Sequence, residues 1–339
     1  MNILSESLAS MKIGDARTFA GLTVFPLLAP EGATARARDY LTLDEALAAR
    51  TVRITEVGEA GHVPELRLQN DGDRPVLLLD GEELIGAKQN RVLNLTVLAP
   101  AGETVVIPVS CVEQGRWRRE SVAFASEAHV MMPNVRRSKA GQVSRSLAAC
   151  GMPRSNQRAV WQDLDTASDR YGAPSDTGAM REIYRRHGRS LDEYVAAFPA
   201  AAGQVGAVFA VEGEVRGAEA FDHPEVLATL LPKVVRSWAL EAIDARPRAH
   251  AVPTREAARA FLDLVGRAGL REHDGVGLGR DFRFDDRRIT GGALLRAGVA
   301  MHLCAFRSEE DVASGPVSGE DGTPRGGRIA APGYRRRRH

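Results

Sequence analysis

The sequence predicts an α+β fold: an antiparallel β-rich N-terminal half, a helical basic connector and an α+β C-terminal half. Between residues 15 and 117, short runs rich in β-branched residues alternate with Gly, Pro, Asn and Asp, as in strands joined by turns. From residue 116, arginines gather among Ser, Gly and Pro, and helical patterns follow. After residue 201, strand-like alternation returns together with two amphipathic helices.

These changes in pattern divide the chain into four parts. We expect a β-rich part at 8–125, a basic connector with helices at 126–200 and an α+β part at 201–306. The segment 307–339 has no apolar periodicity and is predicted to be a disordered tail.

In the N-terminal part, the first strands are predicted at 19–29 and 51–57. Between them, "TLDEALAAR" predicts a short helix with Thr42 as N-cap and Glu45 closing a capping box. Further strands are predicted at "ELRLQN", "VLLLD", "LNLTVLAP" and "TVVIPVSCV".

In the connector, helices are predicted at "GQVSRSLAA", "NQRAVWQDLDTASDRYG", "SDTGAMREIYRRHG" and "SLDEYVAAF". Either Ser175 or Asp176 would cap the third of these helices, because both side chains can accept from backbone N–H groups.

In the C-terminal part, "GAVFAVEGEVRGAEAF" predicts a hairpin that turns at Glu212-Gly213. Asp222 is predicted to cap the next helix, and Thr254 a later one. The buried stripe of the first helix is predicted from i,i+4 spacing to be Val226, Leu230, Val234, Trp238 and Ala242. Strands at "FRFDD", "RRITGGALL" and "GVAMHLCAF" complete the fold, and His302 in the last is expected to be a hydrogen-bonded core residue.

Composition narrows the classes of partner. With 45 basic and 44 acidic residues the formal charge is +1, so no overall field favours nucleic acid or an anionic membrane, and only the terminal "YRRRRH" could attract nucleic acid. No signal-peptide pattern or run of about 20 apolar residues occurs, which predicts a cytoplasmic protein without a membrane partner. Three distant cysteines argue against disulfides and a metal site, and no motif indicates a cofactor.

The basic residues are nearly all arginine. The few lysines are therefore candidates for positions where a compact ammonium is preferred to a planar guanidinium. They are Lys12, Lys88, Lys139 and Lys233.

The first candidate site is the centre of "DGEELIGAKQNRVLN", where four polar residues interrupt two apolar runs. Neither face of a strand or helix stays apolar through it, so we interpret it as a bulge or a strand crossing an open cleft. Lys88 and Arg91 are cations that suit a phosphate or carboxylate, and the amides of Gln89 and Asn90 suit a ribose or base edge. Glu82, which lies upstream, could act as general acid or base. The alternative is a charged edge strand.

The second candidate is "SCVEQGRWR", residues 110–118, which offers an acid, a cation and a stacking surface in Glu113, Arg116 and Trp117. Either Glu82 or Glu113 would then serve as the catalytic acid or base. Cys111 would need a thiolate-stabilising environment to act as a nucleophile, and no histidine is paired with it nearby in the sequence.

Both segments, with "QRAVW" and "AVFAVEGEVRGAEAFDHPEVL", resemble a family of bacterial and archaeal proteins over about residues 8 to 306. The family is named as associated with ADP-ribosylglycohydrolases and with the rhodanese and phosphatase superfamilies. The resemblance implies a gene-neighbourhood link to ADP-ribose or NAD-related chemistry.

We therefore expect binding or processing of a nucleotide-like, phosphate-bearing small molecule, with enzyme activity left open. The alternative is a non-catalytic protein-interaction module. A cleft shared by the two segments would favour the small molecule, whereas a flat exposed edge would favour a protein partner.

Overall fold

The structure is a computed structural model of the 339-residue chain, and it describes residues 2–30, 37–58, 61, 63–245 and 252–308. Of the predicted tail, 307–339, the residues from 309 onward lie outside the described residues. The last described strand runs to Arg307, and the Ser308 N–H donates to the Arg288 carbonyl at 2.8 Å.

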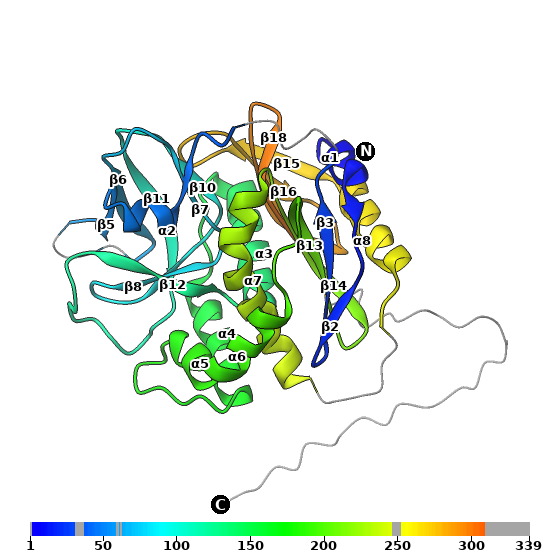
Figure 1. Cartoon of the computed structure of the whole chain (residues 1–339). Helices are drawn as coiled ribbons and strands as arrows, with labels where there is room; N and C mark the ends of the chain where they lie inside the picture. The colour runs from blue at the N-terminus through cyan, green and yellow to red at the C-terminus, as the bar shows by residue number, and fades with distance from the viewer. Residues whose placement is uncertain (1, 31–36, 59–60, 62, 246–251, 309–339) are drawn as a thin grey trace, which may run out of the picture.

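A large antiparallel sheet combines strands from the N-terminal and C-terminal parts of the described residues (Figure 1). Its strand order is β1-β3-β13-β14-β18-β17-β16-β15, and β2 pairs with β3. The strands are β1 (Lys12–Ile13), β2 (Arg17–Phe19), β3 (Leu22–Leu28), β13 (Gln204–Val211), β14 (Glu214–Phe221), β15 (Leu270–Asp274), β16 (Arg280–Phe284), β17 (Ile289–Arg296) and β18 (Val299–Arg307). The N-terminal strand β3 thus lies directly beside β13, with Phe25 opposite Val208.

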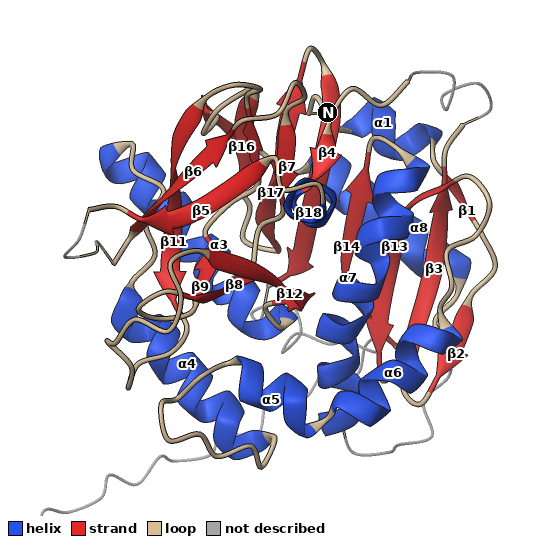
Figure 2. Cartoon of the chain, turned by 60° about the vertical axis from the view of Figure 1, so that its left-hand side comes forward, coloured by secondary structure: helices blue, strands red, loops and turns tan. Residues whose placement is uncertain are grey.

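Helices cover both faces of this sheet. The long helix α7 (Pro224–Asp244) covers one face and contributes to a core that contains Phe209 and Phe306. On the other face lie α1 (Ser5–Ser10) and α8 (Arg255–Arg267), which pack with Phe25 and Leu303 in a second core. Figure 2 shows α7 in front of β14 and β13.

A second, six-stranded antiparallel sheet has the order β12-β8-β9-β11-β6-β5. Its strands are β5 (Val52–Glu56), β6 (Glu65–Asn70), β8 (Glu82–Gly86), β9 (Arg91–Leu93), β11 (Thr104–Cys111) and β12 (Phe124–Val130). The sheet curls until its two edge strands, β5 and β12, contact each other, so its concave face encloses a core of its own. This curled sheet carries both candidate segments.

Shorter elements connect the two sheets. A three-stranded sheet consists of β4 (Leu41–Thr42), β7 (Val76–Leu78) and β10 (Val97–Ala99), and α2 (Leu43–Ala48) packs against it. The connector folds as α3 (Pro133–Cys150), α4 (Gln157–Arg170), α5 (Arg181–Arg186) and α6 (Gly188–Ala197).

The α+β fold class is confirmed, and so are several local predictions. Thr42 and Glu45 form the capping box of α2, and Thr254 caps α8. The hairpin turns at Glu212-Gly213, where both residues have positive φ as a type I′ turn requires. All five residues of the predicted α7 stripe are buried.

Two predicted helix starts are wrong. His223, not Asp222, caps α7, since its imidazole Nδ1 accepts from the Glu225 N–H at 3.2 Å; the Asp222 carboxylate instead accepts from the Tyr40 hydroxyl. The helix predicted from residue 175 begins only at Arg181, because Ser175 accepts from Ala179 N–H within a turn. Five elements of the described residues were not predicted: α1, β1, β4, β12 and β15.

Candidate functional site

The "KQNR" segment occupies the turn between β8 and β9, with Ala87 at a φ of 40° just before it. The polar run therefore interrupts the apolar pattern because the chain reverses there, and β9 starts at Arg91 itself. On its other side β9 pairs with β11, and the pairing places Arg91 directly opposite Cys111. Strand pairing thus brings the two candidate segments side by side, as Figure 2 shows for β9 and β11.

Asn90 links the two segments on one side of the turn. Its N–H donates to Glu113 Oε2 at 3.1 Å, and its Oδ1 accepts from Arg116 Nη2 at 3.0 Å. All three side chains are almost fully buried. They form one connected polar unit, which we call the Asn90–Glu113–Arg116 unit.

Within this unit, Arg116 donates to Glu113 through Nε at 2.8 Å and to the Ala87 carbonyl through Nη1 at 2.9 Å. Glu113 also accepts from the Thr177 hydroxyl at 2.9 Å. Burial alone would raise the pKa of Glu113, but the hydrogen bonds from Arg116 and Thr177 outweigh it and lower that pKa. Glu113 is therefore an ionised carboxylate that holds Arg116 in place.

A cleft of about 410 Å³ opens above this unit. Its opposite wall is the loop 174–180, which is held by backbone hydrogen bonds from Gly115 N–H to Thr177 O at 2.8 Å and from Met180 N–H to Val112 O at 2.9 Å. The residues that line the cleft are Asn90, Glu113, Arg116, Arg118, Glu120, Pro174, Ser175, Asp176, Thr177, Ala179, Arg181, Glu182 and Arg185.

The cleft is strongly charged. Arg116 is paired with Glu113 at the floor, whereas the side chains of Arg118 and Arg185 are 83% and 76% exposed at the rim. Arg118 and Arg181 are 3.9 and 3.7 Å from their nearest carboxylates. Arg185 is closer to its carboxylate, with Nη2 2.6 Å from Glu182 Oε2. Exposed pairs contribute only about 0 to 1 kcal/mol, so these guanidinium groups can turn to an incoming anion at little cost.

A buried acid, Glu83, is paired with a histidine close to the cleft. Glu83 Oε2 is 2.5 Å from His129 Nε2, and His129 stacks on Tyr184 of α5. Burial, with the charge of Glu127, raises the pKa of Glu83 well above its usual range. Burial likewise lowers the pKa of His129 to about 3. His129 is therefore neutral near pH 7, and burial favours the protonated form of Glu83.

The other predicted ligand residues lie on the opposite side of the turn, at the end of the curled sheet. Lys88 Nζ and Arg91 Cζ are 5.5 and 5.8 Å from the centre of the Trp117 ring. Gln89 Oε1 accepts from Arg91 Nη1 at 3.1 Å and from the Cys111 thiol at 3.0 Å. The predicted binding residues are thus divided between the cleft and this second location.

Glu82 lies apart from both locations. Its carboxylate accepts from Lys233 Nζ at 2.6 Å, from Ser126 Oγ at 2.9 Å and from the Leu79 N–H at 3.1 Å. Lys233 belongs to α7, so Glu82 joins the curled sheet to that helix.

Sequence reasoning missed the far wall of the cleft. Arg181 and Arg185 come more than sixty residues after Glu113, in a segment that the sequence predicted only to be helical. The excess of arginine in the connector was visible in the sequence, but nothing local indicated which arginines face the cleft. Glu56, at the end of β5 and only 7% exposed, was also missed.

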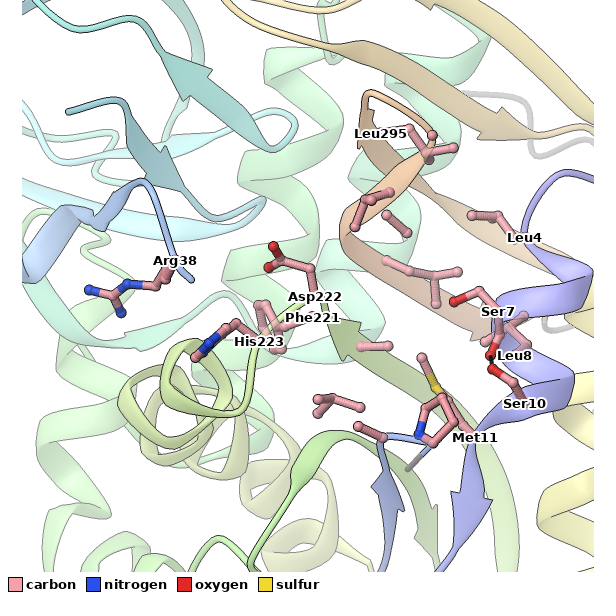
Figure 3. Close-up of a pocket in the computed structure, with 18 of the residues that line it drawn as sticks. Leu4, Ser7, Leu8, Ser10, Met11, Arg38, Phe221, Asp222, His223 and Leu295 are labelled. Atoms are coloured by element: carbon pink, nitrogen blue, oxygen red, sulfur yellow. Dashed lines mark hydrogen bonds between the residues drawn. The ribbon is translucent and has the colours of Figure 1, made fainter. Parts of the chain in front are cut away.

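A separate hollow of about 310 Å³ lies between α1 and the end of β14 (Figure 3). Leu4, Leu8 and Met11 line one side, and Phe221 and Asp222 line the other. It contains none of the predicted site residues, and both of its acids are already engaged: Asp222 with the Tyr40 hydroxyl and Asp39 with Arg296. Within the described residues no cluster of His, Cys, Asp and Glu is arranged to hold a metal ion. In that same part of the chain, no helix is both long and apolar enough to cross a membrane.

Comparison with known proteins gives one match. A family model described as the ARG and Rhodanese-Phosphatase-superfamily-associated Protein domain, ARPP-1, matches residues 10–306. No curated protein and no solved structure matches the chain.

Proposed function

The chain belongs to the ARPP-1 family, and we propose that its arginine-lined cleft binds a nucleotide-like, phosphate-bearing small molecule. The family's name links it to ADP-ribosylglycohydrolases and to the rhodanese and phosphatase superfamilies. A ligand related to ADP-ribose or NAD would fit that link, because it combines phosphates with hydroxyl groups and a base.

One observation carries the proposal: the two candidate segments share a cleft instead of forming a flat edge. Asn90 comes from the first segment, and Glu113 and Arg116 come from the second. The cleft volume of about 410 Å³ lies within the range of roughly 300 to 1,000 Å³ that is usual for small-molecule sites.

We assign the anion to the arginines at the rim. Arg118, Arg181 and Arg185 come from two different walls of the cleft and would donate charge-assisted hydrogen bonds to phosphate oxygens. The Asn90–Glu113–Arg116 unit would keep the floor rigid beneath the ligand, because its donors and acceptors are already engaged with one another.

The arrangement favours binding over proton transfer. Glu113 is held ionised by three hydrogen bonds, and Glu82 is paired with Lys233 away from the cleft. We therefore assign both acids a positioning role in the proposal.

Replacing Arg181 and Arg185 together with alanine is expected to abolish stabilisation by ligand while leaving the unliganded melting temperature nearly unchanged. A ligand at one hundred times its Kd stabilises a protein by about 2.7 kcal/mol, which a thermal-shift assay resolves. The assay would screen ADP-ribose, NAD and simple nucleotides against both proteins.

Arg189→Ala is the matched control, because that side chain is 96% exposed on α6 and lies outside the cleft. It should keep the full ligand shift. If no nucleotide shifts the wild-type protein, or if the double variant shifts as much as the wild type, the cleft is not the binding site.

A second candidate, a protein-interaction module, is favoured by the loop after β11. There the apolar side chains of Trp117 and Val122 are 49% and 69% exposed. If the protein is an interaction module, Trp117→Ala and Val122→Ser would weaken a protein contact. The shifts in melting temperature caused by nucleotides would stay as they are in the wild type.

A further inference from the structure

The concave end of the curled sheet contains polar atoms that are buried and lack hydrogen-bond partners among the described residues. They are Nε and Nη2 of Arg91 and Oε2 of Glu56. Arg91 is 0% exposed and Glu56 is 7% exposed. Such groups are costly to leave unsatisfied, by about 1 to 3 kcal/mol each and more when charged, so they indicate a place for a ligand.

The unsatisfied atoms of Arg91 lie on one edge of its guanidinium. Nη1 is already used, donating to Gln89 Oε1 at 3.1 Å and to the Asn90 carbonyl at 3.3 Å. The edge that remains, Nε with Nη2, presents two parallel N–H groups. This is the geometry that binds two oxygens of one phosphate or carboxylate.

Glu56 requires a different partner. Its Oε1 accepts from the Lys88 N–H at 3.2 Å, so Oε2 is the oxygen that remains. No ion pair joins Glu56 to Arg91 in the part of the chain that the structure describes, although the charge of Glu56 acts on Arg91. An occupant must therefore accept hydrogen bonds from Arg91 and donate one to Glu56.

The ring of Trp117 borders both groups. The Arg91 guanidinium lies 5.8 Å from the ring centre. A Cβ placed on Gly61 would lie 3.3 Å from Glu56 Oε2 and 3.5 Å from Trp117 Cζ2, so backbone, indole and carboxylate meet there. Trp117 is half-exposed, which puts this location at the edge of the protein interior.

We propose that Arg91 and Glu56 form a second anion site, separate from the cleft, that takes a hydrogen phosphate group. Two phosphate oxygens accept from the free edge of Arg91, and the P–OH group donates to Glu56 Oε2. Inorganic phosphate carries such a proton at neutral pH, whereas sulfate does not. The site therefore selects phosphate over sulfate, because sulfate would leave Glu56 facing an oxygen without a proton.

The test is a titration of the full chain with inorganic phosphate, and separately with sulfate, followed by tryptophan fluorescence. Because Trp117 borders the site, a saturable change is expected with phosphate, and sulfate should bind at least tenfold more weakly. Arg91→Lys keeps a positive charge but lacks the two-pronged edge, so it should weaken phosphate binding at least tenfold. Trp117→Phe should remove the signal and identify its source.

A second variant keeps the proposal testable if Arg91→Lys fails to fold. Glu56→Gln supplies an amide that can donate to sulfate, so it should remove the preference for phosphate. Arg181→Ala/Arg185→Ala should leave the phosphate response intact, which separates this site from the cleft. Equal responses to phosphate and sulfate in the wild type, or no saturable response at millimolar phosphate, would overturn the proposal.

Discussion

Lys139→Ala is expected to lower the free energy of unfolding by about 3 to 5 kcal/mol, the range for removing one partner of a buried ion pair. Lys139 lies on α3, is 0% exposed, and donates to the Asp80 carboxylate and to the Leu93 carbonyl, the latter at 2.6 Å. Removing the ammonium leaves the Asp80 carboxylate with the longer contacts from Arg136 Nε at 3.4 Å and from the Cys304 thiol at 3.5 Å. Urea unfolding of the two proteins measures the difference.

Lys12→Ala is the matched control, since Lys12 is exposed and should change stability by less than about 0.5 kcal/mol. Lys139→Met combined with Asp80→Asn should recover part of the loss, because it removes both buried charges. A Lys139→Ala protein as stable as the wild type would show that the pair is not coupled to folding.

The same pair gives stability a pH dependence. Burial would raise the pKa of Asp80, but the Lys139 ammonium and the Arg136 guanidinium outweigh it and lower that pKa to about 2. Because the folded pKa lies below the unfolded value of about 3.9, the contribution is complete above pH 4 and is lost as the pH falls toward 2. Unfolding curves at pH 7, 4 and 3 should show this loss in the wild type and a smaller one in Asp80→Asn.

Trp238→Ala is expected to cost about 3 to 5 kcal/mol, the range for removing a large aromatic side chain from a core. The side chain is 1% exposed and stacks on Phe209 at 4.9 Å and on Phe306 at 6.0 Å between ring centres. The packing is close: a Cβ on Gly217 would lie 2.7 Å from Trp238 Cη2. No neighbour can therefore fill the space by a small shift, and a cavity would remain.

Chemical denaturation of Trp238→Ala, Trp238→Phe and Trp117→Ala tests this prediction. Trp238→Phe should lose less than Trp238→Ala, because it keeps one stacked ring. Trp117→Ala should lose little, because that indole is half-exposed on a loop. Equal losses at positions 117 and 238 would contradict the central place of Trp238 in the core.

The rarity of lysine was a useful signal in the sequence. Lys139 and Lys233 are both buried and both pair with carboxylates, while Lys12 is exposed. The sequence pointed to these positions, but it could not name Asp80 or Glu82 as their partners.

Local features of the chain are what the sequence by itself determined. The capping box of α2, the turn at Glu212-Gly213 and the buried stripe ending at Ala242 each depend on residues close together in the chain. Their energies come from neighbouring backbone groups and from helical or strand periodicity, which a sequence displays directly. The predicted N-cap of α7 was wrong by one residue, because the Asp222 carboxylate accepts a hydrogen bond from a residue far away in the sequence, Tyr40.

Only the tertiary structure decided how these pieces meet. Pairing of β3 with β13 joins the N-terminal strands to the C-terminal part of the fold, and pairing of β9 with β11 sets Arg91 opposite Cys111. The same contacts divide the residues of "KQNR" between the cleft, where Asn90 lies, and the sheet interior, where Arg91 lies. Partners so far apart in sequence are selected by the packing of whole sheets and by the need to satisfy buried charges, and no local pattern encodes that choice.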